Sequence, residues 1–128
     1  MIPVSTIRLS VTAREQLITL KRHTGIRQWN VLCRWAFATS LAELSMPPRQ
    51  VHPADSNVEM TWKVFGGTHE AVYAALLVER CIADGLPVTE EVLAEQFRLH
   101  LHRGIAYLVG SRESRSIEGL VQRGLHAG

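Results

Sequence analysis

The stretch VSTIRLSVTAREQLITLKRHTGIRQWNVLCRWAFATSLAEL, residues 4–44, decides the fold, because it contains a strand signal followed by two helix signals. Over residues 4–9 the side chains alternate between two faces, which is typical of a short strand with Thr6 and Arg8 on the same face. A strand and two helices within about 45 residues have the length of a ribbon-helix-helix DNA-binding unit, whose paired strands read a groove. Any β-α-α beginning looks similar, so a groove-reading strand is one interpretation of this pattern and not the only one.

Both helices of this stretch have recognisable ends. Ser10 or Thr12 can cap the first helix, which is expected to continue to about residue 23 and to stop at Gly25. The second helix is expected over residues 27–44 and is apolar on nearly all sides. A helix of this kind lies either at the centre of a core or between subunits, and the small size of the chain favours a subunit interface.

Beyond residue 44, the pattern predicts a polar, proline-containing loop and then a second strand over residues 58–65, where apolar side chains alternate. Further helices are expected, of which 90–103 is capped by Thr89 and should turn Arg98 and His102 towards water. The remaining expected elements are a helix over 69–84, a short apolar turn at 105–109 and a weak helix near 117–121.

These patterns together predict the fold class and the organisation of the chain. We expect a mainly α, compact helical domain with an N-terminal strand–helix–helix, ribbon-helix-helix-like start and one further short strand. The 128 residues are expected to form a single domain, with residues 1–45 as the DNA-contacting part and residues 58–128 as the helical body.

Composition sets limits on the location and the assembly of the protein. Hydrophobic residues make up 46% of the chain and charged residues only 20%, which favours burial of surface against another copy. No apolar run is long enough to span a bilayer, and the first residues do not have the pattern of a signal peptide. We therefore expect a cytoplasmic protein, in which Cys33 and Cys81 are buried thiols.

Positive charge is concentrated near the N-terminus. Residues 8–34 carry six basic side chains against one acidic side chain, whereas residues 66–128 carry six basic and eight acidic ones. Phosphate groups need distributed positive charge, so this asymmetry indicates a polyanion-binding face. The alternative is a solvated basic surface that binds nothing. The basic residues of this region are Arg8, Arg14, Lys21, Arg22, Arg27 and Arg34.

The Gly66-Gly67-Thr68 turn is a second candidate for contact with phosphate. It lies between a predicted strand and a predicted helix, where exposed amides favour an anion and glycines allow close approach. Lys63 lies just upstream. The structural alternative is a tight turn in which Thr68 caps the following helix, and the absence of a GK[ST] ending argues against a nucleotide P-loop.

Neither a metal site nor a catalytic site is indicated. His100 and His102 lie two residues apart on a predicted helix, so their side chains point away from each other and cannot share an ion. A metal-dependent nuclease commonly needs clustered carboxylates beside a lysine, but Thr61 stands where a carboxylate would be wanted near Lys63. We therefore expect no cofactor and no metal ion.

The whole chain resembles the DndE family, the small subunits of bacterial DNA phosphorothioation systems. The resemblance rests on segments that are specific only in combination. These are Ile7-Arg8-Leu9-Ser10, Trp29-Asn30-Val31-Leu32-Cys33-Arg34, Thr61-Trp62-Lys63-Val64-Phe65-Gly66-Gly67, Asp84-Gly85-Leu86-Pro87 and residues 99–104.

The resemblance implies a helical, DNA-contacting subunit that forms a homotetramer and has no catalytic motif of its own. It also implies partners: a cysteine desulfurase, a sulfurtransferase-like subunit and an SMC-like ATPase, which together replace a backbone phosphate oxygen with sulfur. We expect double-stranded DNA, bound on its backbone and preferentially at nicks, to be the ligand. The alternatives are a nicking endonuclease and a scaffold without DNA contact. The residues expected to contact DNA are Arg8, Arg14, Lys21, Arg22, Arg27, Arg34, Lys63, Gly66, Gly67 and Thr68.

Overall fold

The computed structural model describes residues 2–111 and residue 121, so the helix expected near residues 117–121 lies outside the described part except for its last residue. The elements confirm a mainly helical fold with a strand–helix–helix start and one further short strand. In chain order they are β1 (Thr6–Arg8), α1 (Val11–Thr24), α2 (Trp29–Ala42), β2 (Glu59–Thr61), α3 (Trp62–Gly66), the 3-10 turn η1 (Gly67–His69), α4 (Glu70–Ala83) and α5 (Glu90–Gly110).

The ends of α1 follow directly from local sequence. The Ser10 hydroxyl accepts a hydrogen bond from the amide of Ala13, so Ser10 is the cap and Thr12 lies inside the helix. At the other end, Gly25 adopts a left-handed conformation with φ of 75° and donates its amide to the Lys21 carbonyl. Both ends of α1 are as predicted, except that Thr12, the alternative cap, is excluded.

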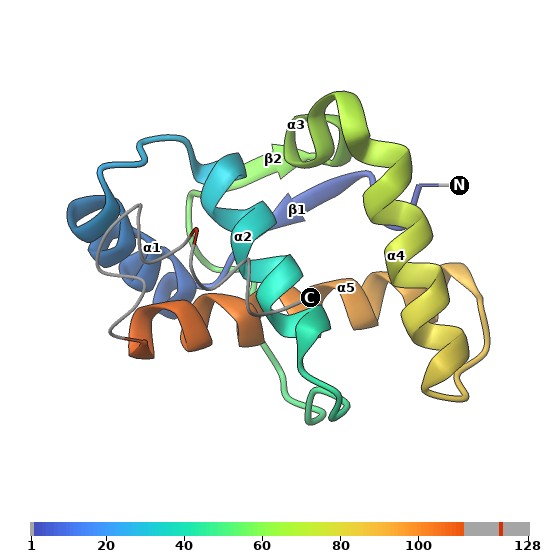
Figure 1. The fold of residues 1–128 in the computed structure, drawn as a ribbon. Helices are drawn as coiled ribbons and strands as arrows, with labels where there is room; N and C mark the ends of the chain where they lie inside the picture. The colour runs from blue at the N-terminus through green and yellow to red at the C-terminus, as the bar shows by residue number, and fades with distance from the viewer. Residues whose placement is uncertain (1, 112–120, 122–128) are drawn as a thin grey trace.

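Helix α5 is the centre of the molecule and is longer than predicted. Figure 1 shows it running along the base of the domain from beneath α1 to beside α4, with α2 packed against its middle. The residues expected to form a separate turn at 105–109 continue this helix to Gly110. His102, which was predicted to face water, is buried, and Arg98 is half-buried. Both faces of α5 are therefore covered over its central turns.

The two strands form a small antiparallel sheet within one chain. Thr6 pairs with Thr61 and Arg8 pairs with Glu59, and the central pair, Ile7 and Met60, points into the core. In a ribbon-helix-helix unit the first strand pairs with the same strand of a second copy, whereas β1 here pairs with β2. The strand–helix–helix start is thus present, with its strand paired within the chain.

The second strand is much shorter than the predicted range 58–65, because the chain turns into a helix at Trp62. The Thr61 hydroxyl accepts a hydrogen bond from the amide of Val64 and caps the single turn of α3. Trp62 and Phe65, three residues apart, then point into the core together, while Val64 is 52% exposed. Helical spacing therefore replaces the alternation that predicted a strand.

The core joins the N-terminal half of the chain to the C-terminal half. Its aromatic centre consists of Phe37, Phe65 and Phe97, whose ring centroids lie 5.0–5.8 Å apart. The three rings come from α2, α3 and α5. This packing fixes α2 and α3 relative to each other, and that relationship positions the candidate site.

Candidate nucleic-acid interface

The exposed face of the β1–β2 sheet carries the first group of predicted DNA contacts. Thr6 and Arg8 of β1 are exposed, as predicted, beside Glu59 and Thr61 of β2. The Arg8 guanidinium donates to the Glu59 carboxylate at 2.8 Å, so much of its charge is balanced locally. This face therefore has a weaker positive potential than the sequence of β1 indicates.

The basic residues of α1 differ in how accessible they are. Arg14 forms an ion pair with Glu15 at 2.9 Å. The Lys21 ammonium lies 3.3 Å from the centroid of the Trp29 ring, in a cation–π contact that ties α1 to α2, and burial lowers the pKa of Lys21. Arg22, by contrast, is exposed at the C-terminal end of α1, and Arg27 is exposed in the following connection. Basic side chains at this end also complement the helix dipole.

The structure brings together two candidates that lie far apart in sequence, Arg34 of α2 and the glycine turn after α3. The Arg34 guanidinium donates to the Phe65 carbonyl at 2.9 Å, and Asn30, one turn earlier, donates to the Val64 carbonyl at 3.2 Å. A Cβ atom on Gly67 would lie 3.4 Å from Arg34 Nη1. Arg34 of α2 therefore borders the turn directly, with the exposed Lys63 on the neighbouring α3.

The backbone of the glycine turn is partly committed to its own fold. Gly67 has φ of 60° and ψ of −140°, a conformation almost restricted to glycine, and its amide donates to the Lys63 carbonyl. Gly66 is buried, and a Cβ atom on it would lie 2.6 Å from Glu70 Cβ. Thr68 is exposed but is not the cap of α4, which begins after His69 without a side-chain cap. The prediction of a Thr68 cap is therefore wrong, because η1 intervenes.

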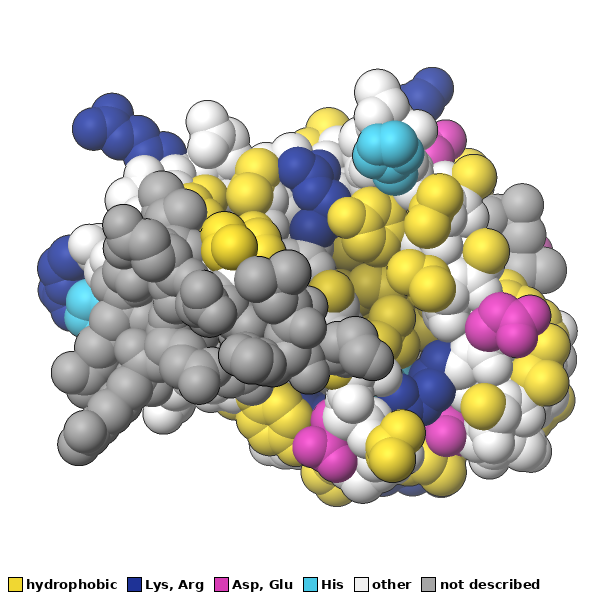
Figure 2. Space-filling model, viewed as in Figure 1, with side chains coloured by type: hydrophobic (Ala, Val, Ile, Leu, Met, Phe, Trp, Pro, Cys, Tyr) yellow, Lys and Arg dark blue, Asp and Glu magenta, His cyan; other side chains and the backbone are white. Residues whose placement is uncertain are grey.

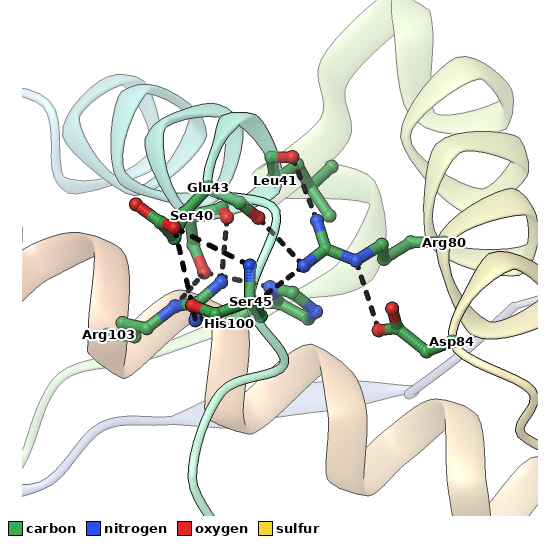
Figure 3. A network of polar contacts seen from close by, with 8 residues as sticks. All are labelled: Ser40, Leu41, Glu43, Ser45, Arg80, Asp84, His100 and Arg103. Carbon is green, nitrogen blue, oxygen red and sulfur yellow. Dashed lines mark hydrogen bonds and ion pairs between the residues drawn. The ribbon is translucent and has the colours of Figure 1, made fainter.

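A buried polar network, which the sequence did not reveal, holds α2 in position at its other end. Arg80 of α4 and Arg103 of α5 approach the end of α2 from opposite sides (Figure 3). Arg80 donates to the carbonyls of Leu41, Glu43 and Ser45 at 2.7–2.9 Å and pairs with Asp84 at 3.0 Å. Arg103 donates to the Ser40 carbonyl and hydroxyl, both at 2.8 Å. The two guanidinium groups thus satisfy carbonyls that the helix end leaves unpaired.

His100 belongs to the same network and is neutral within it. Its Nδ1 lies 2.8 Å from the Ser40 hydroxyl, which also accepts a hydrogen bond from Arg103. Burial, together with the nearby charges of Arg80 and Arg103, lowers the pKa of His100 to about 4. Its Nε2 is buried and has no hydrogen-bond partner among the residues that the structure describes. The only sequence signal for this network is the position of Arg80 and Arg103 among apolar residues of predicted helices.

A cavity lies elsewhere, between the start of α1, the loop after α2 and α5. It has a volume of about 350 Å³, and none of the ten predicted DNA-contact residues lines it. His52 and His102 stack at its wall with ring centroids 4.3 Å apart. Burial lowers the pKa of His102 to about 4. Among the residues that the structure describes, no three His, Cys, Asp or Glu side chains gather as metal ligands.

Both cysteines are buried, as predicted, and burial raises the pKa of the Cys33 thiol to about 12. No helix in the described part of the chain is long and apolar enough to cross a membrane.

Comparisons with a family model and with solved structures point to the same family. The family model of the DNA sulphur modification protein DndE matches residues 6–116. The crystal structure of DndE from Escherichia coli B7A, described as involved in DNA phosphorothioation modification, superposes with a TM-score of 0.68 at 23% sequence identity, covering 82% of this chain and 96% of that chain. A double glycine-to-lysine mutant of DndE has a TM-score of 0.66 at 19% identity and covers 84% of this chain and 99% of its own. No curated protein matches the sequence.

Proposed function

Because the chain belongs to the DndE family of DNA sulphur modification proteins, we propose that it is the DNA-binding subunit of a bacterial phosphorothioation assembly. In this proposal it docks on the DNA backbone and assists the incorporation of sulfur. The observation that carries the proposal is the positively charged edge formed by the end of α1, the α1–α2 connection and α3. We call it the basic edge and define it by Arg22, Arg27 and Lys63, which are all exposed.

The basic edge suits the backbone of DNA better than its bases. Figure 2 shows dark blue side chains at the upper and left margins of the face in view, and others nearer its middle. Separated positive charges can contact several phosphates of a duplex and supply affinity that depends on salt and not on sequence. Arg8 and Arg14 are weaker candidates because each is paired with a glutamate.

A nick is the proposed preferred target. Exchange of a backbone oxygen for sulfur needs access to a phosphate, and a strand break supplies flexibility and extra negative charge there. The turn formed by Gly66, Gly67 and Thr68 borders Arg34 and Lys63, so an anion at this point would meet positive charge from two helices. Since the Gly67 amide is already bonded, side chains rather than the Gly67 amide would make the contact.

We propose a non-catalytic role, with a nicking endonuclease as the alternative. The basic edge contains donors for phosphate but no nucleophile with an adjacent base, so it fits binding better than cleavage. The chain would act as a homo-oligomer, a tetramer by family resemblance, together with the desulfurase, the sulfurtransferase-like subunit and the SMC-like ATPase. With DNA as its ligand, the assembly would work in the cytoplasm, and residues 1–45 would supply most of the DNA-contacting part.

The proposal is tested by mobility shift on intact, nicked and single-stranded DNA of one sequence in EDTA, with the strands then separated on a denaturing gel. We expect a shift that is strongest for nicked duplex and no new strand breaks. Strand cleavage on adding Mg²⁺ would favour the nickase. Failure to shift any of the three DNAs would favour a scaffold.

A further inference from the structure

The cavity between the start of α1, the loop after α2 and α5 takes no part in the proposed DNA contacts. Its volume of about 350 Å³ lies within the range of pockets that bind small molecules. No residue of the basic edge lines it, and neither does any residue of the glycine turn. It is therefore a candidate for a ligand of its own, and we call it the α1–α5 cavity.

The loop on one side of this cavity is held firmly in place. The Arg98 guanidinium donates to the His52 carbonyl from Nε at 2.9 Å and from Nη2 at 2.6 Å. Three prolines of the same loop, Pro47, Pro48 and Pro53, also line the cavity, and the ring of each proline fixes its φ angle. Because this wall is already ordered, little conformational entropy is lost when a ligand binds against it.

Aromatic side chains give the cavity flat surfaces. The His52 ring stacks on the His102 ring with centroids 4.3 Å apart, and Tyr107 of α5 lines the cavity and is 38% exposed. Burial and the nearby charge of Arg98 lower the pKa of His52, so this ring is neutral at pH 7. Neutral aromatic faces favour a planar aromatic ring in the ligand.

Side-chain amides are available beside these rings. Gln16 of α1 and Gln50 of the loop both line the cavity, and neither side chain has a hydrogen-bond partner within residues 2–111 or at residue 121. A primary amide presents a donor next to an acceptor, which is the pattern that pairs with the edge of a nucleobase, as glutamine pairs with adenine. The ring that the cavity favours is therefore one with hydrogen-bonding atoms on its edge.

Among the described residues that line the cavity, Arg103 alone carries a charge at pH 7. It is only 9% exposed, and its hydrogen bonds go to the neutral groups of Ser40 and Ser45 (Figure 3). Its ion-pair partners in the described part of the chain are none, although Glu43 and Asp84 lie farther off. The carbonyls at the end of α2 balance only part of a full charge. Since buried charges are ordinarily paired, an anionic group on a ligand would complement Arg103.

We propose that the α1–α5 cavity binds a free nucleoside monophosphate. Its phosphate lies at Arg103, its base stacks on the His52 ring, and the edge of the base bonds to Gln16 and Gln50. A mononucleotide unites the three features that the cavity calls for, which are a planar ring, a hydrogen-bonding edge and a localised negative charge. The inference is independent of DNA binding, because the cavity and the basic edge share no residue.

Isothermal titration calorimetry of the full chain with adenosine 5′-monophosphate tests this proposal, and two fragments of the nucleotide divide it into parts. We expect saturable binding of the nucleotide with a Kd below about 1 mM. Adenosine, which lacks the phosphate, and ribose 5-phosphate, which lacks the base, should each bind at least tenfold more weakly. Absence of saturable nucleotide binding would overturn the proposal. Equal affinities for ribose 5-phosphate and the nucleotide would also overturn it, because the base would then not be recognised.

A cavity-filling variant tests the location. Ala106 lines the cavity and is exposed on α5, so Ala106→Trp fills the space without removing a packed side chain. We expect this variant to lose nucleotide binding while its circular dichroism spectrum is retained. Ala83→Trp, the same change at an exposed position of α4 outside the cavity, is the matched control and should keep the wild-type affinity. Binding that persists in a folded Ala106→Trp variant would contradict the proposed location.

His52→Ala is a second variant that does not rely on filling the cavity. Arg98 bonds to the backbone carbonyl of His52, so the attachment of the loop does not need the imidazole ring. Loss of the ring is expected to weaken binding of the nucleotide and of adenosine by the same factor, at least fivefold. An unchanged affinity for the nucleotide would refute the stacked base.

Fluorescence anisotropy with a labelled nicked duplex distinguishes a free nucleotide from the end of a DNA strand. We expect the wild type and Ala106→Trp to give the same result with this duplex, because the cavity lies apart from the basic edge. Weaker duplex binding by Ala106→Trp would mean that the cavity holds a strand end, and would overturn the assignment to a free nucleotide.

Discussion

A Cβ atom on Gly104 would overlap the carbonyl oxygen of Ala36. The backbones of α5 and α2 therefore meet at this crossing with no room for a side chain. Gly104 looks like a helix stop in the sequence, but it lies within α5, six residues before the helix ends at Gly110. Its function is close helix packing, and this packing places α2 against the core.

We predict that Gly104→Ala destabilises the fold by about 3 kcal/mol, because the methyl group must displace the backbone of α2. Urea denaturation monitored by circular dichroism measures this. Gly110→Ala is the control, since an added Cβ there meets nothing within 4 Å, and its effect should stay within about 0.5 kcal/mol. Similar stabilities for the two variants would mean that the crossing is looser than the structure indicates.

A second prediction concerns Arg80 in the polar network at the end of α2. Arg80→Lys is expected to cost about 2–4 kcal/mol, because a lysine ammonium cannot donate to three carbonyls from one position while pairing with Asp84. Thermal unfolding compared with Arg22→Lys provides the measurement. Since Arg22 is exposed, its replacement should change stability by less than about 0.5 kcal/mol. An Arg80→Lys variant as stable as this control would show that the hydrogen bonds of Arg80 to the end of α2 do not stabilise the fold.

A third prediction concerns pH. The pKa values of His100 and His102 are lowered by burial from 6.5 to about 4 in the folded chain, so the unfolded chain takes up protons first as the pH falls. Stability should be complete above pH 6.5 and decline as the pH falls towards 4, by up to on the order of 3 kcal/mol for each histidine.

The measurement for this prediction is urea denaturation at pH 7.5 and at pH 5.0. Arg80, Arg103 and Asp84 face His100, and His52 and Arg98 face His102, so replacement of one histidine should remove only its own part of the dependence. We therefore expect His102→Gln to lose less stability between these two pH values than the wild type. Equal losses would place the titrating group elsewhere.

A fourth prediction concerns the glycine turn. Gly67→Ala is expected to destabilise the protein by about 1–3 kcal/mol, because φ of 60° with ψ of −140° is strained for any residue with a Cβ atom. It therefore tests backbone conformation and not binding. Lys63→Ala is the cleaner probe of anion contact, and we expect it to weaken binding to nicked DNA while thermal stability is retained. Unchanged affinity would remove Lys63 from the basic edge.

The parts of the fold that local chemistry determines could be predicted from the sequence. Three helix boundaries are correct to within a residue or two, because contacts with sequence neighbours determine them. Helices begin after Ser10 and Thr89, and one helix stops at Gly25. The predicted second strand is too long because apolar side chains alternate from Val58 to Val64. In the structure, packing of Trp62 and Phe65 against the core makes the chain helical from Trp62 onward. Periodicity cannot show which of two compatible patterns the rest of the core selects.

The candidate site was predictable only in its components. The sequence identifies Arg34 and Gly67 separately, but they lie 33 positions apart, and their proximity depends on how α2 and α3 pack on α5. Likewise, Arg8 and Arg14 count as positive charge in the sequence, and only the structure pairs them with Glu59 and Glu15. Burial of His102 could not be anticipated, because α5 was expected to expose one face.

The measurement that tests the central claim most directly is the salt dependence of binding to a labelled nicked duplex in EDTA, followed by fluorescence anisotropy. We predict binding at about 50 mM salt that weakens steeply as salt rises. The triple variant Arg22→Glu, Arg27→Glu and Lys63→Glu should bind more weakly, with the slope of log affinity against log salt reduced by about three. Arg49→Glu, outside the basic edge, should keep the wild-type slope. No binding by the wild type at low salt, or an unchanged slope in the triple variant, would contradict the account.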